Sequence, residues 1–166
     1  MIDFFFSTLS SLIALACIVL ISLWSSNDDF GYLGTPSWDK NLFAVHPVMM
    51  VSGFFPAMSL AIAITIILKA YPSISKYSHL GLQIIAIVFL IVGLYAVIKL
   101  IDDQGSDHLT VAHSWLGIIV VVGIFLNVCT GLIKTFLIRD KTSEAFNTLN
   151  DYHDYLGNFD PPKYST

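Results

Sequence analysis

The residues of this 166-residue chain best suited to chemistry are histidines at the edges of long apolar stretches. His46, His79 and His113 each lie near the start of such a stretch, at spacings of 33 and 34 residues. His153 follows 40 residues later, and a polar segment follows it. Because an imidazole can bind a metal or carry a proton, histidines at a constant depth in apolar surroundings indicate a functional site.

The composition is that of a membrane protein. The chain is 55% hydrophobic and only 12% charged, about half the charged share of a soluble domain. Four stretches reach the roughly 20 residues that a helix needs to cross a bilayer. We place them at residues 4–24, 43–68, 79–101 and 111–138. They are continuously apolar rather than alternating, which excludes barrel strands and a soluble enzyme.

The sequence therefore predicts an all-α, multi-pass membrane protein. We expect a four-helix transmembrane bundle over residues 1–141 and a polar tail over residues 142–166. A weak amphipathic pattern over residues 143–156 predicts a short helix on the inner membrane surface. The first stretch has no basic segment before it and no small-residue cleavage site after it, so we expect a retained helix rather than a signal peptide.

Charge predicts the orientation of the chain in the membrane. Six of the eight lysines and arginines fall in the second loop, at the end of the fourth stretch or beyond it. Only Lys40 and Lys99 lie on the opposite side, which is otherwise acidic. The positive-inside rule therefore predicts that both termini are inside. The chain carries no basic stripe with interleaved aromatic residues, which argues against nucleic acid as a partner.

Alternating span direction sorts the histidines into two levels. The second and fourth stretches enter from outside, so we expect His46 and His113 near the outer face. The third enters from inside, which puts His79 near the inner face. Two imidazoles from different helices at one depth can clamp a haem, whose iron accepts axial ligands from both sides. Gly53 and Gly117, near the faces of these histidines, would let the porphyrin approach the backbone.

Other interpretations of the histidines stay open. They would serve equally as hydrogen-bonding groups between helices, or as side chains facing a wet cavity. A zinc site lacks a third ligand at the outer level, because His108 and His113 would point roughly 140° apart on a helix. A transporter is a weaker alternative, because the other polar groups in the spans are only Gln83 and Asn127, and no carboxylate lines a path.

Three short motifs give the chain a family resemblance. HPVMMVSGF at 46–54, HLGLQ at 79–83 and HSWLG at 113–117 resemble the cytochrome b561 family. The near-constant histidine spacing, with its wider last gap, is similar to that family as well. The resemblance covers roughly residues 43–153, and HPVMM together with HSWLG at this spacing is quite specific.

The resemblance implies a six-helix membrane protein with two b haems. Such proteins carry electrons across the membrane, commonly from ascorbate inside to monodehydroascorbate or ferric chelates outside. It implies that His46 and His113 ligate the iron of one haem, and His79 and His153 that of the other. Basic residues near the inner haem would help to bind ascorbate, and the counterparts here are Lys69, Lys76 and Arg139.

The sequence departs from the family pattern after its fourth histidine. In the family that histidine opens a fifth spanning helix and a sixth follows, whereas here His153 precedes a polar segment with Asp160, Pro161 and Pro162. We therefore expect a shortened form without the fifth and sixth helices. This departure favours the haem between His46 and His113 over the second one.

Two functions follow from the sequence. The first is a haem b protein that carries electrons across or along the membrane; an active form would be an oxidoreductase of the ascorbate or ferric reductase type. The second is a non-catalytic structural subunit of a larger membrane complex, built on a similar scaffold with one haem or none. The expected partners are haem, the lipid bilayer, and other membrane subunits or a second copy of the chain.

Overall fold

The computed structural model describes residues 2–26, 34–138 and 142–158 and consists there of helices and their connections. It divides into two compact units, Met1–Asp107 and His108–Thr166, and each is described by itself. The helices of the first unit are α1 (Ile2–Ser26), α2 (Leu42–Val48), the π-helical η2 (Met49–Phe54), α3 (Phe55–Ile67) and α4 (Pro72–Asp103). Those of the second are α5 (Ala112–Leu132), the π-helical η3 (Ile133–Leu137) and α6 (Glu144–Asn158).

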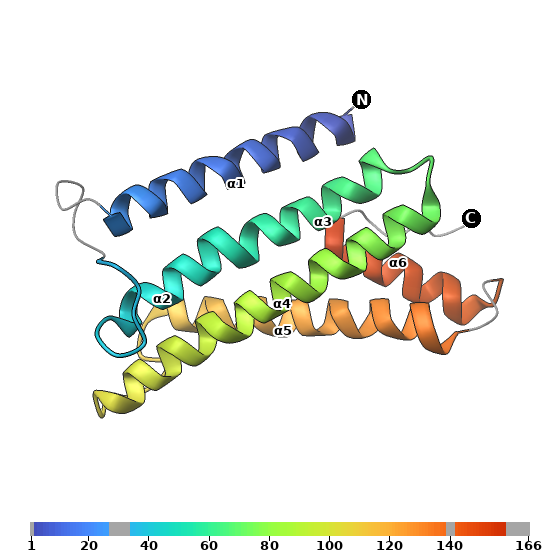
Figure 1. Cartoon of the computed structure of the whole chain (residues 1–166). Helices are drawn as coiled ribbons and strands as arrows, with labels where there is room; N and C mark the ends of the chain where they lie inside the picture. Colours follow the sequence, from blue (N-terminus) through green and yellow to red (C-terminus); the bar gives the residue numbers. More distant parts are fainter. Residues whose placement is uncertain (1, 27–33, 139–141, 159–166) are drawn as a thin grey trace. The chain divides into compact units, whose positions relative to one another are not determined.

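The first unit consists of three rods. The segments α2, η2 and α3 follow one another without a break and form the middle rod, with α1 on one side and α4 on the other (Figure 1). The middle rod begins where the side chain of Asn41 accepts a hydrogen bond from the backbone N–H of Ala44 at 3.3 Å. This N-cap fixes the start of the helix one turn before His46.

The all-α, multi-pass expectation is confirmed. Four helices in the described residues are long and apolar enough to cross a membrane, namely Thr8–Ser26, Leu42–Ile67, Pro72–Asp103 and Ala112–Leu137. The largest difference from the expected spans is at α4, which begins at Pro72 instead of residue 79. Proline starts a helix at little cost because its missing N–H would have no partner there. His79 therefore lies two turns inside α4.

The buried residues are mostly small, and the large apolar side chains are mostly exposed, as is typical of a membrane protein. In the part of the chain whose burial the structure describes, eleven apolar residues are buried; seven of them are alanines, and all eleven lie in the first unit. Leucine, isoleucine and phenylalanine are instead exposed in large numbers. Small residues let helix backbones approach closely, while large apolar side chains meet lipid without penalty. On the middle rod, Ala57, Ala61 and Ala63 are buried, and Oγ of Ser59 lies 3.4 Å from Oγ of Ser10 in α1.

The two prolines of the middle rod flank its π-helical segment. Pro47 is the sixth residue of α2, one residue before its end at Val48. Pro56 is the second residue of α3. The structure has a wider turn just before it, in which the N–H of Phe55 bonds to the carbonyl of Met50, five residues back. Wide turns of this kind are one way in which a helix accommodates an interruption of its bonding.

Gly53 marks a close contact between the middle rod and α4. A Cβ added at Gly53 would overlap the ring carbons of Phe89, which belongs to α4. The ring therefore lies directly on the glycine backbone. Gly81 of α4 is different, because an added Cβ there would meet no heavy atom within 4 Å.

In the second unit the chain reverses after η3, and α6 packs back against α5. The hydroxyl of Ser143 accepts a hydrogen bond from the N–H of Phe146 at 3.2 Å and so caps the start of α6. Along α6, the side chains of Phe146, Leu149 and His153 are half-buried, whereas Asn147 is exposed. The expected amphipathic face thus packs against a neighbouring helix of its own unit.

We predict that Gly53→Ala destabilises the protein by about 1–3 kcal/mol, because the added methyl group would displace the Phe89 ring. The measurement is denaturant unfolding of the protein in detergent. Gly81→Ala is the matched control, and it should leave stability unchanged or raise it by up to about 1 kcal/mol, since alanine is the better helix former. Equal effects of the two substitutions would contradict the contact.

Candidate functional site

His46 contacts the neighbouring rod through one ring nitrogen. It is half-buried in α2, and its Nδ1 lies 3.0 Å from the backbone carbonyl oxygen of Gly93 in α4. A carbonyl oxygen can only accept, so Nδ1 carries the proton and the lone pair is on Nε2. Gly93 permits this approach, because a Cβ there would come within 3.2 Å of Met50 Sδ and 3.3 Å of Met49 Cβ.

His79 makes the same contact in the opposite direction. Its Nδ1 lies 2.8 Å from the carbonyl oxygen of Ala61, a fully buried residue of α3. Each of the two rods thus provides one histidine and one accepting carbonyl. Along α4, His79 and Gly93 are 14 residues apart, which corresponds to about 21 Å of helix. The first unit therefore holds two imidazoles of the same tautomer at two well-separated levels.

His153 repeats the contact in the second unit. Its Nδ1 lies 3.2 Å from the carbonyl oxygen of Asn127 and 3.5 Å from the hydroxyl of Thr130, both in α5. The ring also lies on Gly131, where an added Cβ would be 2.9 Å from its Cε1 atom. Glycine at 131 is therefore what allows the imidazole to reach the backbone of α5.

These contacts are what a metal-binding histidine requires. A hydrogen bond from Nδ1 to a carbonyl sets the tautomer, orients the ring and leaves Nε2 with the lone pair that binds a metal. His46, His79 and His153 each have this arrangement. The accepting carbonyls belong to Gly93, Ala61 and Asn127, and backbone oxygens give no signal in a sequence. Only the glycines that allow close approach were visible beforehand, and Gly131 was not among the predicted site residues.

The remaining predicted cofactor-binding residues in the second unit are His113 and Gly117. His113 is the second residue of α5 and is exposed. At Gly117, one turn further along, an added Cβ would meet no described atom within 4 Å. The packing of its own unit therefore does not require glycine at 117. Gly53 differs, because the Phe89 ring lies against it where the sequence predicts a porphyrin.

The polar residues around these positions divide into exposed cations and buried amides. Lys69 and Lys76 are exposed around the start of α4, and His108 is exposed in the connection before α5. Arg139 lies outside the described residues. The side-chain oxygens of Gln83 and Asn127 are buried and have no hydrogen-bond partner in the part of the chain that the structure describes.

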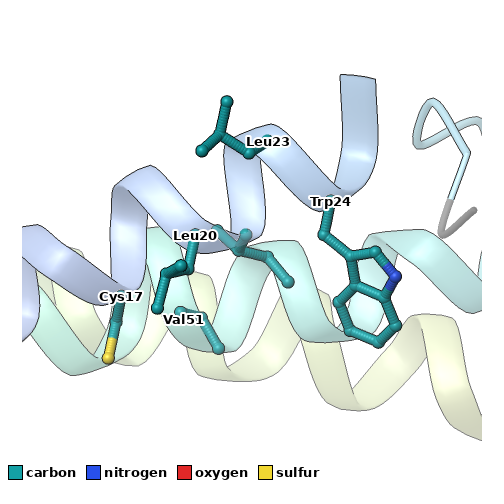
Figure 2. A pocket seen from close by; sticks show the side chains of 6 residues that line it. Cys17, Leu20, Leu23, Trp24 and Val51 are labelled. Atoms are coloured by element: carbon teal, nitrogen blue, oxygen red, sulfur yellow. The ribbon is translucent and has the colours of Figure 1, made fainter. Parts of the chain in front are cut away.

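An apolar groove between α1 and η2 is separate from these histidines (Figure 2). It has a volume of about 350 Å³ and is lined by Cys17, Leu20, Ile21, Leu23 and Trp24 of α1 and by Val51 of η2. The lining offers no ionisable group apart from a cysteine thiol. The groove therefore does not explain the histidines and is not the candidate site.

Comparison with known proteins shows the family of the chain. The family model for eukaryotic cytochrome b561 matches residues 45–159. The chain belongs to the cytochrome b561 family. This cytochrome b561 homologue is 35% identical over 115 residues to a probable ascorbate-specific transmembrane electron transporter of Oryza sativa subsp. japonica, covering 68% of the chain and 49% of that relative. No solved structure matches the chain.

Two further relatives carry related names. A transmembrane ascorbate ferrireductase of Arabidopsis thaliana is 25% identical over 138 residues, which cover 83% of the chain and 60% of the relative. A plasma membrane ascorbate-dependent reductase of Xenopus laevis is 29% identical over 127 residues, covering 74% of the chain and 44% of the relative. The chain spans about half the length of the curated relatives that it matches.

We predict that His46, His79 and His153 of the haem-free protein carry the proton on Nδ1, because each donates to a backbone carbonyl. Nitrogen-15 NMR of histidine-labelled protein in detergent measures the tautomer directly, and single His→Gln variants assign the signals. Protonation of Nε2 at these three residues would contradict the contacts described above.

Proposed function

We propose that this cytochrome b561 family member binds haem b and carries electrons across the membrane. The observation that carries the proposal is the shared Nδ1–carbonyl contact, which presents Nε2 of His46, His79 and His153 as a ligand. Imidazole is a common axial ligand of haem iron, so the donor set fits this cofactor. Haem b supplies reversible one-electron chemistry when it is bound.

Span direction supports the assignment of His46 and His113 to an outer haem. Both residues lie near the first turn of a span that enters from the same side. The separation of about 21 Å between His79 and Gly93 along α4 fits two ligand levels within a hydrocarbon core of about 30 Å. Gly117 would allow a flat cofactor to approach α5, whereas Gly53 serves the packing of Phe89.

The position of α6 in its own unit supports His79 and His153 as the inner pair. The sequence placed His153 on a surface helix, which made the second haem the weaker expectation. In the structure His153 contacts Asn127, ten residues before the end of η3, or about 15 Å of helix. His79 lies seven residues after the start of α4, or about 10 Å. If both termini are inside, as the charge pattern predicts, α4 begins and η3 ends at the inner face, and each residue would then lie in the inner half of the membrane.

The names of the relatives suggest ascorbate as the electron donor. With both termini inside, Lys69 and Lys76 lie at the inner end of the first unit, where they would attract an anionic donor. Arg139 joins them on the evidence of its sequence position alone. No observation supports the alternative of a non-catalytic structural subunit, whether from the fold or from the relatives.

We predict that the purified protein shows the reduced-minus-oxidised spectrum of a bis-imidazole b-type haem. Replacing His46 or His113 with alanine should remove one haem, because each would supply one of the two axial ligands of its iron. His79→Ala and His153→Ala should remove the other. The measurement is the pyridine haemochrome ratio of haem to protein, expected at about two per chain.

His108→Ala serves as the control for these substitutions, because His108 is exposed in a connection between helices. It should leave the haem content unchanged. Haem-free protein from cells supplied with haem would overturn the proposal. Loss of haem in the His108 variant as well would show that the losses do not report on ligation.

We predict that Lys76→Met raises the KM for ascorbate several-fold in proteoliposomes with an external ferric chelate, because a charge that attracts the donor is removed. Lys99→Met is the matched control. It removes a lysine from the other end of α4, where Lys99 pairs with Asp103 at 2.7 Å. An unchanged KM in the Lys76 variant, or an equal rise in both, would contradict the role of Lys76.

A further inference from the structure

A second polar contact joins α5 and α6 beside His153. The ammonium nitrogen of Lys134, in η3, donates a hydrogen bond to the side-chain oxygen of Asn150 at 2.9 Å. Lysine has only donors, so the amide of Asn150 must present its oxygen to the ammonium group. No role for Lys134 or Asn150 follows from the sequence motifs or from haem ligation itself.

The Lys134–Asn150 and His153–Asn127 contacts join the same faces of the two helices. On α5 and η3, Asn127 and Lys134 are seven residues apart and lie on one helical face, two turns from each other. On α6, Asn150 and His153 are three residues apart and also share a face. The helices are therefore held at two points, one at the imidazole and one at the ammonium group.

Polar contacts contribute more than usual to fixing the position of α6 on α5. The helix is largely polar, and in the part of α6 whose side chains the structure describes the half-buried large apolar residues are Phe146 and Leu149. A hydrogen bond from a charged donor is about twice as strong as a neutral one. An ammonium group near the end of a membrane span also gains by finding an acceptor, because leaving it without one in apolar surroundings is costly.

We propose that Lys134 and Asn150 form a latch that positions His153 for ligation. The latch sets how α6 lies along α5, so that the imidazole reaches the carbonyl of Asn127 over Gly131. Lys134 and Asn150 are positioning residues, because they act through His153 and not on the cofactor. The positioning role rests on the proposed ligation of the inner haem by His153, whereas the latch contact itself does not.

The first test measures the latch without reference to haem. Hydrogen exchange of α6 amides in haem-free protein should quicken roughly tenfold or more in Lys134→Met and Asn150→Leu, because a hydrogen bond to a charged group is lost. Asn150→Asp keeps the acceptor and adds a negative charge, so exchange should be as slow as in the wild type or slower. Asn147→Leu is the matched control on the exposed side of α6 and should change nothing.

The second test measures the positioning of His153 in haem-loaded protein. Lys134→Met and Asn150→Leu should shift the low-spin electron paramagnetic resonance signal and the midpoint potential of one haem, or abolish that signal. The signal that is lost in His46→Ala should be unaffected. Asn150→Asp should restore the wild-type signature, which a general loss of stability in the two other variants would not explain.

The outcomes separate the two levels of the proposal. Unchanged α6 exchange in both latch variants overturns the latch. If α6 exchange is faster in Lys134→Met and Asn150→Leu but the signals of both haems are unaltered, the positioning of His153 is overturned. If His153→Ala also keeps both haems, the proposed ligation by His153 is overturned as well. If the wild type binds no haem, the proposed function fails while the exchange experiment still decides the latch.

Discussion

The reciprocal contact between the middle rod and α4 is the interaction on which the arrangement of the first unit depends. His46 reaches across to Gly93, and His79 reaches back to Ala61. Burying an imidazole N–H in an apolar medium without an acceptor would cost about 2–7 kcal/mol of free energy. The two bonds therefore set both the register of the helices and the tautomer of the two histidines.

Small residues make this arrangement accessible. Gly93 admits the side chains of the middle rod, and Ala61 keeps its carbonyl within reach of the imidazole. Gly53 admits the Phe89 ring, while at Gly117 no described atom would meet an added Cβ. Glycines that follow a histidine in the sequence thus have different surroundings. Gly53 is packed against a ring, and Gly117 is open within its own unit, which composition alone does not distinguish.

The second unit applies the same principle to a polar helix. His153 is hydrogen-bonded to a backbone carbonyl of α5 and lies against Gly131, but the described side chains of α6 include few large apolar ones. The hydrogen bond from the charged Lys134 adds an attachment between the helices that apolar packing does not provide. The tail, for which the sequence predicts a helix on the membrane surface, therefore carries a histidine that contacts the backbone of α5.

The sequence by itself determined the four apolar spans, the all-α class and the family, because hydropathy and motif spacing depend on residue order alone. It could not determine that α4 begins at Pro72, that Phe89 covers Gly53 or that α6 returns along α5. Nor could it find the carbonyl partners of His46, His79 and His153, since every residue carries a backbone oxygen. Only the tertiary structure decided which oxygen each imidazole meets, because helix register and close approach at small residues bring distant segments into hydrogen-bonding range.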